Sequence, residues 1–335
     1  MRRRVIFGCA GTTLAPEERD FFRRVQPFGF ILFGRNIETR AQVRALTAAL
    51  RDTVNDPRAP VLIDQEGGRV ARLKPPQWPA RPAQAVFGTR FAADPEAARE
   101  AAYLNARLIA ADLRDIGVTV DCLPVLDLPV PGAHDIIGDR AFSSDPHVVI
   151  ELGRAVIDGL MDGGVLAVMK HVPGHGRAGC DSHLALPRVS VPVEQLSAAD
   201  FVTFRSLAHC PMAMTAHVVY DAIDPNRPAS LSPRVVKEVI RGEIGYQGLL
   251  MTDDLSMQAL SGPLSARAKA ALFAGCDVVL HCNGDMGEMQ DVAAEAKPLE
   301  GQWLKRAEQA LGHLAEPAEF DPGAAAARLN ELLSA

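Results

Sequence analysis

Short apolar runs alternate with amphipathic stretches from one end of the chain to the other. Each run is four to six residues long, as expected of a strand buried in a parallel sheet. The eight runs cover residues 5–10, 28–33, 60–63, 118–123, 166–169, 212–216, 248–251 and 278–281. The stretches between them have a helical pattern, and five begin at a proline, which is well tolerated in the first turn of a helix. They predict helices over residues 16–25, 40–54, 95–116, 146–163, 193–207, 233–244, 263–274 and 286–297.

Strands that alternate with helices predict βα units and a parallel sheet. Eight strands with eight helices fit an α/β fold of the TIM (β/α)8 barrel type, with room for slight irregularity. A doubly wound open sheet would place a ligand at one switch point, whereas here polar residues follow six of the eight predicted strands, which favours the barrel. They are Asp64, Gln65 and Glu66; Asp127 and Arg140; Lys170 and His171; His217; Asp253 and Asp254; and Asn283.

The end of the chain predicts additional helices outside the barrel, at residues 306–314 and 324–333. No linker, repeat or low-complexity tract marks a second domain. We therefore expect a single catalytic domain over residues 1–335, with the barrel at about residues 4–297 and the C-terminal helices at about residues 300–335.

Composition narrows the classes of function. With 48% hydrophobic and 23% charged residues, the chain can bury a large core, and its net charge of −6 without a basic stripe argues against a nucleic-acid partner. No run approaches the roughly 20 apolar residues that span a bilayer, and the one after the arginines at residues 2–4 is too short for a secretory signal. Six cysteines without a CxxC pair suit reduced thiols, so we expect a cytoplasmic protein. We also expect it to act as a monomer, without a membrane partner.

Candidate chemistry concentrates after the fifth predicted strand. Lys170, His171, His175, Asp181 and His183 lie within fourteen residues, among glycines and a proline that exclude a regular helix. A histidine oriented by a neighbouring carboxylate, such as His183 with Asp181, can give up a proton and take one back.

A second candidate centre follows the seventh predicted strand, where Asp253 and Asp254 are adjacent. Consecutive strand residues point to opposite faces, so only one of the two carboxylates should easily face the barrel mouth, and the other should cap a helix or brace a neighbour. A carboxylate at the mouth can be a covalent nucleophile, a metal ligand or a structural charge. Polar residues at other strand ends can then hold sugar hydroxyls, namely Asp64, Arg72, Arg140, Lys170 and His171.

Five motifs resemble the signatures of glycoside hydrolase family 3. They are residues 63–72 (IDQEGGRVAR), 137–142 (IGDRAF), 170–176 (KHVPGHG), 181–183 (DSH) and 252–257 (TDDLSM). More narrowly, they are similar to those of the single-domain bacterial β-N-acetylglucosaminidases of peptidoglycan recycling, and they occur in the same order across most of the chain. The resemblance implies a TIM barrel and retaining, two-step removal of terminal β-linked N-acetylglucosamine. The subgroup's role in cell-wall recycling implies muropeptide fragments as the substrate.

Carried over position by position, the resemblance makes Asp253 the nucleophile, His183 the general acid/base and Asp181 its partner. It assigns the binding of the non-reducing sugar to Asp64, Arg72, Arg140, Lys170 and His171, and it implies no cofactor and no metal. The chain departs from the usual pattern at Val172, where relatives have Phe, and at Arg177 and Ala178, where many have Asp-Thr.

Several alternatives stay open at the level of sequence. The same site can serve a β-N-acetylglucosaminide phosphorylase or a β-glucosidase, although glucosidases of the family commonly draw a glutamate from a second domain, for which this chain ends too early. A metal-dependent barrel hydrolase would use the histidines and Asp253 as ligands, but Lys170 beside them would repel a dication. A silent sugar-binding barrel would need neither Asp253 nor His183. Substrate-assisted catalysis by the acetamido group is a further mechanism.

Overall fold

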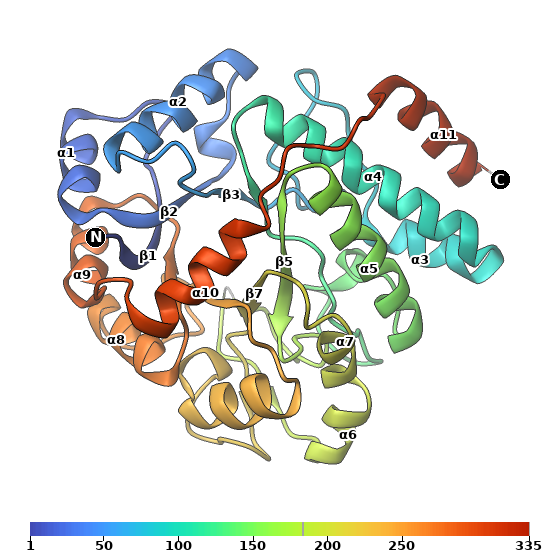
Figure 1. Cartoon of the computed structure of the whole chain (residues 1–335). Helices are drawn as coiled ribbons and strands as arrows, with labels where there is room; N and C mark the ends of the chain where they lie inside the picture. The colour runs from blue at the N-terminus through green and yellow to red at the C-terminus, as the bar shows by residue number, and fades with distance from the viewer. Residues whose placement is uncertain (183, 335) are drawn as a thin grey trace.

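The computed structural model of the chain describes residues 1–182 and 184–334. Eight parallel strands close into a barrel in the order β1-β10-β9-β7-β5-β4-β3-β2 (Figure 1). They are β1 (Arg3–Gly8), β2 (Pro27–Leu32), β3 (Val61–Ile63), β4 (Val120–Asp121), β5 (Leu166–Val172), β7 (Met212–Thr215), β9 (Leu249–Asp254) and β10 (Val278–His281). Each overlaps one predicted run, and the TIM-type barrel predicted from the sequence is confirmed.

Helices surround the barrel, and most begin where the sequence supplies a cap or a proline. Asp94 and Asp145 accept hydrogen bonds from the first turns of α4 and α5, each of which also starts with proline. The outer helices are α1 (Pro16–Val25), α2 (Arg40–Thr53), α3 (Gln84–Ala93), α4 (Pro95–Asp115), α5 (Pro146–Asp162), α6 (Val193–Ala198), α7 (Asp200–Ser206), η4 (Val235–Glu243), α8 (Leu264–Ala274) and α9 (Met286–Glu295). No helix within the described residues has both the length and the apolarity needed to cross a membrane.

The structure corrects several predicted elements. The helix predicted over residues 193–207 breaks at Ala199, whose φ of −122° and ψ of −73° are not helical. The break turns Asp200 inward, where its carboxylate pairs with Arg177 at 2.7 Å. Helix α3 and the small sheet of β6 (Arg188–Val189) and β8 (Val219–Tyr220) were not predicted, and η4 is a π-helix.

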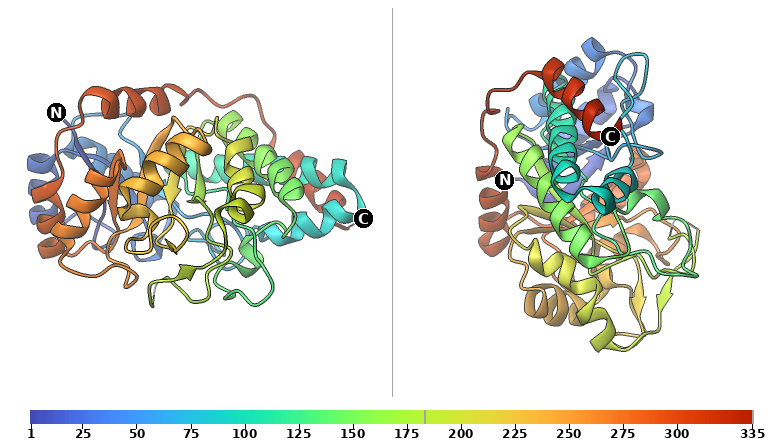
Figure 2. Two further views of the ribbon diagram at one scale, coloured as in Figure 1. Left: turned by 90° about the horizontal axis from the view of Figure 1, so that it is seen from below. Right: turned by 90° about the vertical axis from the view of Figure 1, so that its right-hand side faces the viewer.

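The core has two layers because strand residues alternate in direction. Val5 and Phe7 of β1 point outward to the helices, whereas Ile6 points into the barrel interior. Helix α10 (Gly301–Gly312) crosses the amino-terminal ends of the strands, on the side opposite the long loops (Figures 1 and 2). Its residues Ala307 and Ala310 complete the interior cluster. The last helix, α11 (Pro322–Ser334), packs beside α4.

A buried ion cluster lies at this amino-terminal face, and we call Arg4, Arg241, Arg306 and Asp277 the Asp277 cluster. The Asp277 carboxylate accepts hydrogen bonds from Arg241 at 2.7 Å, from Arg306 at 3.0 Å and from the backbone N–H of Leu250 at 2.8 Å. Arg4 donates to the backbone carbonyl of Asp277 at 2.8 Å. The cluster therefore joins β1, β9, β10 and α10.

Candidate active site

The carboxyl ends of the strands surround a cavity of about 460 Å³. All five predicted sugar-binding residues and the predicted nucleophile line it: Asp64, Arg72, Arg140, Lys170, His171 and Asp253. Apolar side chains, including Met214, Met257 and Leu280, form other parts of the wall. Polar groups that converge within a partly apolar cavity are typical of a small-molecule site.

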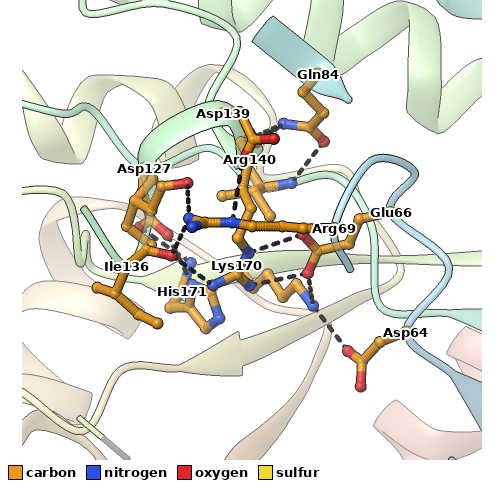
Figure 3. A network of polar contacts seen from close by, with 12 residues as sticks. Asp64, Glu66, Arg69, Gln84, Asp127, Ile136, Asp139, Arg140, Lys170 and His171 are labelled. Atoms are coloured by element: carbon orange, nitrogen blue, oxygen red, sulfur yellow. Dashed lines mark hydrogen bonds and ion pairs between the residues drawn. The ribbon is translucent and has the colours of Figure 1, made fainter. Parts of the chain in front are cut away.

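Five charged residues at one side of the cavity form the rim network: Asp64, Glu66, Arg72, Arg140 and Lys170. The Lys170 ammonium contacts Asp64 at 2.9 Å and Glu66 at 2.6 Å. Arg140 binds both oxygens of Glu66, at 2.8 and 2.9 Å, and Arg72 contacts Asp64 at 3.1 Å. Figure 3 shows Lys170 between the two carboxylates. Lys170 of β5 thus binds the loop after β3 through two carboxylates, and Arg140, from the loop after β4, binds the same loop through Glu66.

The rim network holds Asp64, Glu66 and Lys170 in their charged forms. Burial alone raises the pKa of Asp64 and of Glu66, but Lys170 and an arginine beside each one outweigh burial and lower both pKa values. Burial likewise lowers the pKa of Lys170, and the two carboxylates reverse this to a net increase. Ionised donors and acceptors fixed on one wall suit the hydroxyls of a sugar.

Asp253 lies on β9 and borders the cavity beside the rim network. Burial raises its pKa, but the nearby imidazoles of His171 and His217 and the backbone N–H of Asp254, which donates to Oδ1 at 2.8 Å, give a net lowering. The carboxylate is therefore ionised at neutral pH. An ionised carboxylate at the wall of a sugar-sized cavity has the charge required of a nucleophile.

Asp254 braces its neighbours, as expected for the second member of the pair, although it borders the cavity as well. Its carboxylate accepts hydrogen bonds from the backbone N–H groups of Ser256 and Cys282, each at 3.1 Å. Its backbone carbonyl accepts a hydrogen bond from His217 Nε2 at 3.0 Å, and His217 Nδ1 contacts the Ser230 hydroxyl at 2.7 Å. Strand β9 is therefore held on both sides near Asp253.

The loop after β5 carries the predicted acid/base pair. His183 lies outside the described residues, and its predicted role stays a prediction. Asp181 is half-buried in this loop, and its carbonyl accepts the backbone N–H groups of Leu184 and Ala185, both at 3.0 Å. The adjacent Ser182 lines the cavity, and its hydroxyl contacts His175 Nε2 at 3.1 Å.

Two further contacts fix the earlier part of this loop. Arg177 pairs with the buried Asp200 of α7, and the carbonyl of Ala178 accepts the backbone N–H of His134 at 2.9 Å. The departure from the usual motif at residues 177 and 178 is thus accommodated by contacts to two neighbouring segments. Burial lowers the pKa of His175 to about 4, so this histidine is neutral at physiological pH.

The sequence placed Glu66, Asp127 and His217 at strand ends, but it gave the two carboxylates no role and His217 only that of a metal ligand in the alternative hydrolase. Glu66 connects Lys170 with Arg140, and Asp127 contacts the ring of His171. The sequence marked these residues only by their position after a strand. Many solvated residues without a function have the same position. Within residues 1–182 and 184–334, no group of three or more His, Cys, Asp or Glu side chains is arranged to hold a metal ion.

Comparison with known proteins agrees with the geometry of the barrel. The model of the glycosyl hydrolase family 3 N-terminal domain matches residues 12–313. A β-hexosaminidase of Alkalilimnicola ehrlichii is 44% identical over 283 residues, which are 83% of this chain and 80% of that protein. A β-hexosaminidase of Xanthomonas axonopodis pv. citri is 40% identical over 309 residues, covering 90% of this chain and 89% of the relative.

Solved structures of similar enzymes have the same fold. Native NagZ from Neisseria gonorrhoeae superposes with a TM-score of 0.87 at 32% identity, covering 99% of this chain and 98% of that one. The same enzyme in complex with N-trifluoroacetyl-D-glucosamine has a TM-score of 0.88 at 32% identity, covering 100% of this chain and 98% of the other.

Proposed function

The chain belongs to glycosyl hydrolase family 3, and from this premise we propose that it is a retaining exo-β-N-acetylglucosaminidase, with the barrel and its terminal helices working as one catalytic domain. It is a glycoside hydrolase, since both the family and its β-hexosaminidase relatives are. The observation that carries the proposal is the ionised Asp253 carboxylate in the cavity that the rim network also lines. The Neisseria enzyme bound to an N-acylated glucosamine supports the same class of substrate.

The proposed reaction has two steps. An oxygen of Asp253 attacks the anomeric carbon and forms a glycosyl ester, while the glycosidic bond breaks and His183 gives a proton to the leaving oxygen. His183 then takes a proton from water, whose oxygen attacks the anomeric carbon and releases Asp253. Two inversions at the anomeric carbon return the β configuration. Asp181 orients the imidazole and stabilises its protonated form.

The rim network and His171 bind the non-reducing sugar in this proposal. Each charge of the rim network is already balanced by a neighbour at 2.6 to 3.1 Å, so its side chains need little rearrangement to receive the hydroxyls. Preorganised donors of this kind stabilise a transition state without further ordering.

The natural substrate that we propose is a muropeptide fragment with terminal N-acetylglucosamine, cleaved in the cytoplasm during cell-wall recycling. All six cysteines are free thiols, and five of them are buried, which supports a reducing compartment. Hydrolysis of purified muropeptides, compared with chitin fragments and with β-glucosides, tests this choice. The same panel with added phosphate separates hydrolysis from phosphorolysis through the sugar phosphate that only the latter forms.

A fluorosugar inactivator tests the covalent mechanism directly. We expect mass spectrometry of the inactivated protein to place one glycosyl adduct on Asp253, and turnover of a chromogenic β-N-acetylglucosaminide to survive exhaustive chelation. No adduct on any aspartate would contradict the covalent route. Activity lost on chelation and restored by zinc would instead support a metal-dependent hydrolase.

Leaving-group dependence tests the role of His183. His183→Ala should slow cleavage of poor leaving groups by about 10²- to 10⁴-fold and activated aryl leaving groups much less, because the latter need little proton donation. Equal losses for both classes would exclude His183 as the general acid.

A further inference from the structure

Asp127 is a fully buried carboxylate next to the cavity that has no part in the proposed reaction. It follows β4, and its two oxygens receive three N–H groups from the strand and turn that carry His171. Oδ1 accepts the backbone N–H of His171 at 3.2 Å and that of His175 at 2.7 Å, and Oδ2 contacts His171 Nδ1 at 2.7 Å. Figure 3 shows Asp127 and His171 on the side of Lys170 that is turned away from Asp64.

These contacts decide which ring nitrogen of His171 carries the proton. An ionised carboxylate can only accept hydrogen bonds, and the 2.7 Å contact therefore requires a proton on Nδ1 of His171. Burial raises the pKa of Asp127, but His171 and the backbone donor of His175 outweigh burial and lower it, so the carboxylate is ionised at neutral pH. In the neutral imidazole, Nε2 then has a free lone pair.

We propose that Asp127 is a positioning residue that fixes the tautomer of His171, so that His171 meets the sugar as a hydrogen-bond acceptor through Nε2. This inference rests on the proposed function for the identity of the ligand. His171 lines the cavity. Both carboxylate oxygens of Asp127 contact the strand and turn, and Asp127 lies behind the cavity lining, so the carboxylate acts on the sugar through the imidazole.

The adjacent Lys170 supplies a hydrogen-bond donor that complements the acceptor of His171. Its ammonium has three N–H donors and no acceptor, and two contacts already go to Asp64 and Glu66. Lys170 therefore offers one donor to a ligand, while His171 offers an acceptor from the next position of the same strand. A sugar hydroxyl both donates and accepts, and a donor beside an acceptor distinguishes it from an ether or a methyl group.

Asp127→Asn separates positioning from simple packing because it keeps the shape and removes one acceptor. If the amide oxygen faces the two backbone N–H groups, the amide N–H₂ faces His171 Nδ1, which must then lose its proton. If the amide is turned over, N–H₂ opposes two backbone donors. In the first orientation Nε2 carries the proton, and the group offered to the sugar changes from acceptor to donor.

Nitrogen NMR of the histidine rings in the full chain measures the tautomer. In the wild type at pH 8, we expect His171, assigned by its absence from His171→Gln, to be protonated at Nδ1 and not at Nε2. Asp127→Asn should reverse this. Asp277→Asn, which changes another buried carboxylate that accepts a backbone N–H, should leave the signal unchanged. A wild-type ring protonated at Nε2, alone or at both nitrogens, would overturn the inference even if Asp127→Asn does not fold.

Steady-state kinetics gives a second test of the role of Asp127. Asp127→Asn should lower kcat/KM for a chromogenic β-N-acetylglucosaminide by about 10- to 100-fold, as is common for residues that orient a ligand-binding histidine. Asp127→Asn combined with His171→Gln should be no slower than His171→Gln alone, whereas fully additive losses would contradict action through His171. A wild type with the expected tautomer but without turnover would contradict the proposed function and leave the assignment of the tautomer intact.

Discussion

The two ends of the barrel each hold a group of buried and half-buried charges, and the two groups are used differently. The Asp277 cluster lies under α10, and its carboxylate receives hydrogen bonds from two arginines and a backbone N–H. The rim network has the same kinds of side chain at similar distances, but it borders a cavity of about 460 Å³. Charges that are closed off by a helix hold the chain together, whereas charges that face a cavity can also bind a ligand.

The difference predicts that substitutions at the two ends separate into two classes. A buried carboxylate that loses its partners destabilises the fold, because an unpaired charge in the interior is costly. A charge at the cavity wall has some access to water and affects binding and turnover first. Four substitutions test this separation, and their expected effects decrease from Asp253 to His175.

Asp253→Ala should lower kcat by at least about 10⁴-fold, because the proposed reaction loses the carboxylate that forms the glycosyl ester. Its thermal unfolding midpoint should stay close to that of the wild type. Turnover and differential scanning calorimetry of the same preparation measure both. A variant that retains a tenth of wild-type turnover would remove Asp253 from the mechanism.

Asp277→Ala should reduce the free energy of unfolding by about 3 to 5 kcal/mol, because Arg241 and Arg306 lose their shared carboxylate. Where the variant is folded, kcat/KM should remain within about twofold of the wild type, since the cluster lies at the opposite end of the barrel from the cavity. Urea denaturation and initial rates at 25 °C test the two statements. A large loss of turnover in fully folded protein would break the proposed separation.

Lys170→Met should lower kcat/KM by about 10²-fold, equivalent to about 3 kcal/mol, through loss of a charged donor and of the carboxylates' orientation. It should also weaken the acid dependence of stability. In the wild type, the lowered pKa values of Asp64 and Glu66 stabilise the fold above about pH 4, and acidification removes this contribution. Urea midpoints of both proteins from pH 7 to pH 3 should therefore converge, and parallel curves would contradict the assigned pairing.

His175→Gln should give the smallest effect. The pKa of His175 is lowered by burial to about 4, below its ordinary value of 6.5, so the unfolded chain binds more protons between these values. Stability in the wild type consequently falls as the pH drops below 6.5, by about 1.4 kcal/mol at pH 5.5. His175→Gln should lack this loss of stability at low pH. Urea denaturation of both proteins at pH 7.5 and 5.5 measures the difference in the free energy of unfolding. An unchanged difference between the two pH values would show that His175 titrates normally.

Much of the fold was predictable because each barrel strand is a short apolar run between amphipathic helices. The wall of the cavity was partly predictable, since parallel strands bring their carboxyl ends together and place Asp64, Lys170 and Asp253 at one face. Pairing between elements was not predictable. Whether Glu66 meets Arg140 depends on side-chain packing across the barrel, which no spacing along the chain encodes.

The missed elements have a similar explanation. Helix α3 has a weak apolar pattern and no capping side chain, and the break at Ala199 follows from the partner that Asp200 finds in Arg177. The ring contact of His171 with Asp127 likewise joins residues 44 positions apart. Such features arise from tertiary contacts that override local preference.

Barrel closure has a consequence for the order of folding. Strand β1 pairs on one side with β2 and on the other with β10, and Arg4 reaches Asp277 across 273 positions of sequence. On a ribosome, the first strand therefore waits with one edge unpaired until nearly the whole barrel has been synthesised. Loop closure over such a separation is slow, and an open parallel edge can associate with other chains in the meantime. Chaperone dependence during synthesis would be a natural outcome of this topology.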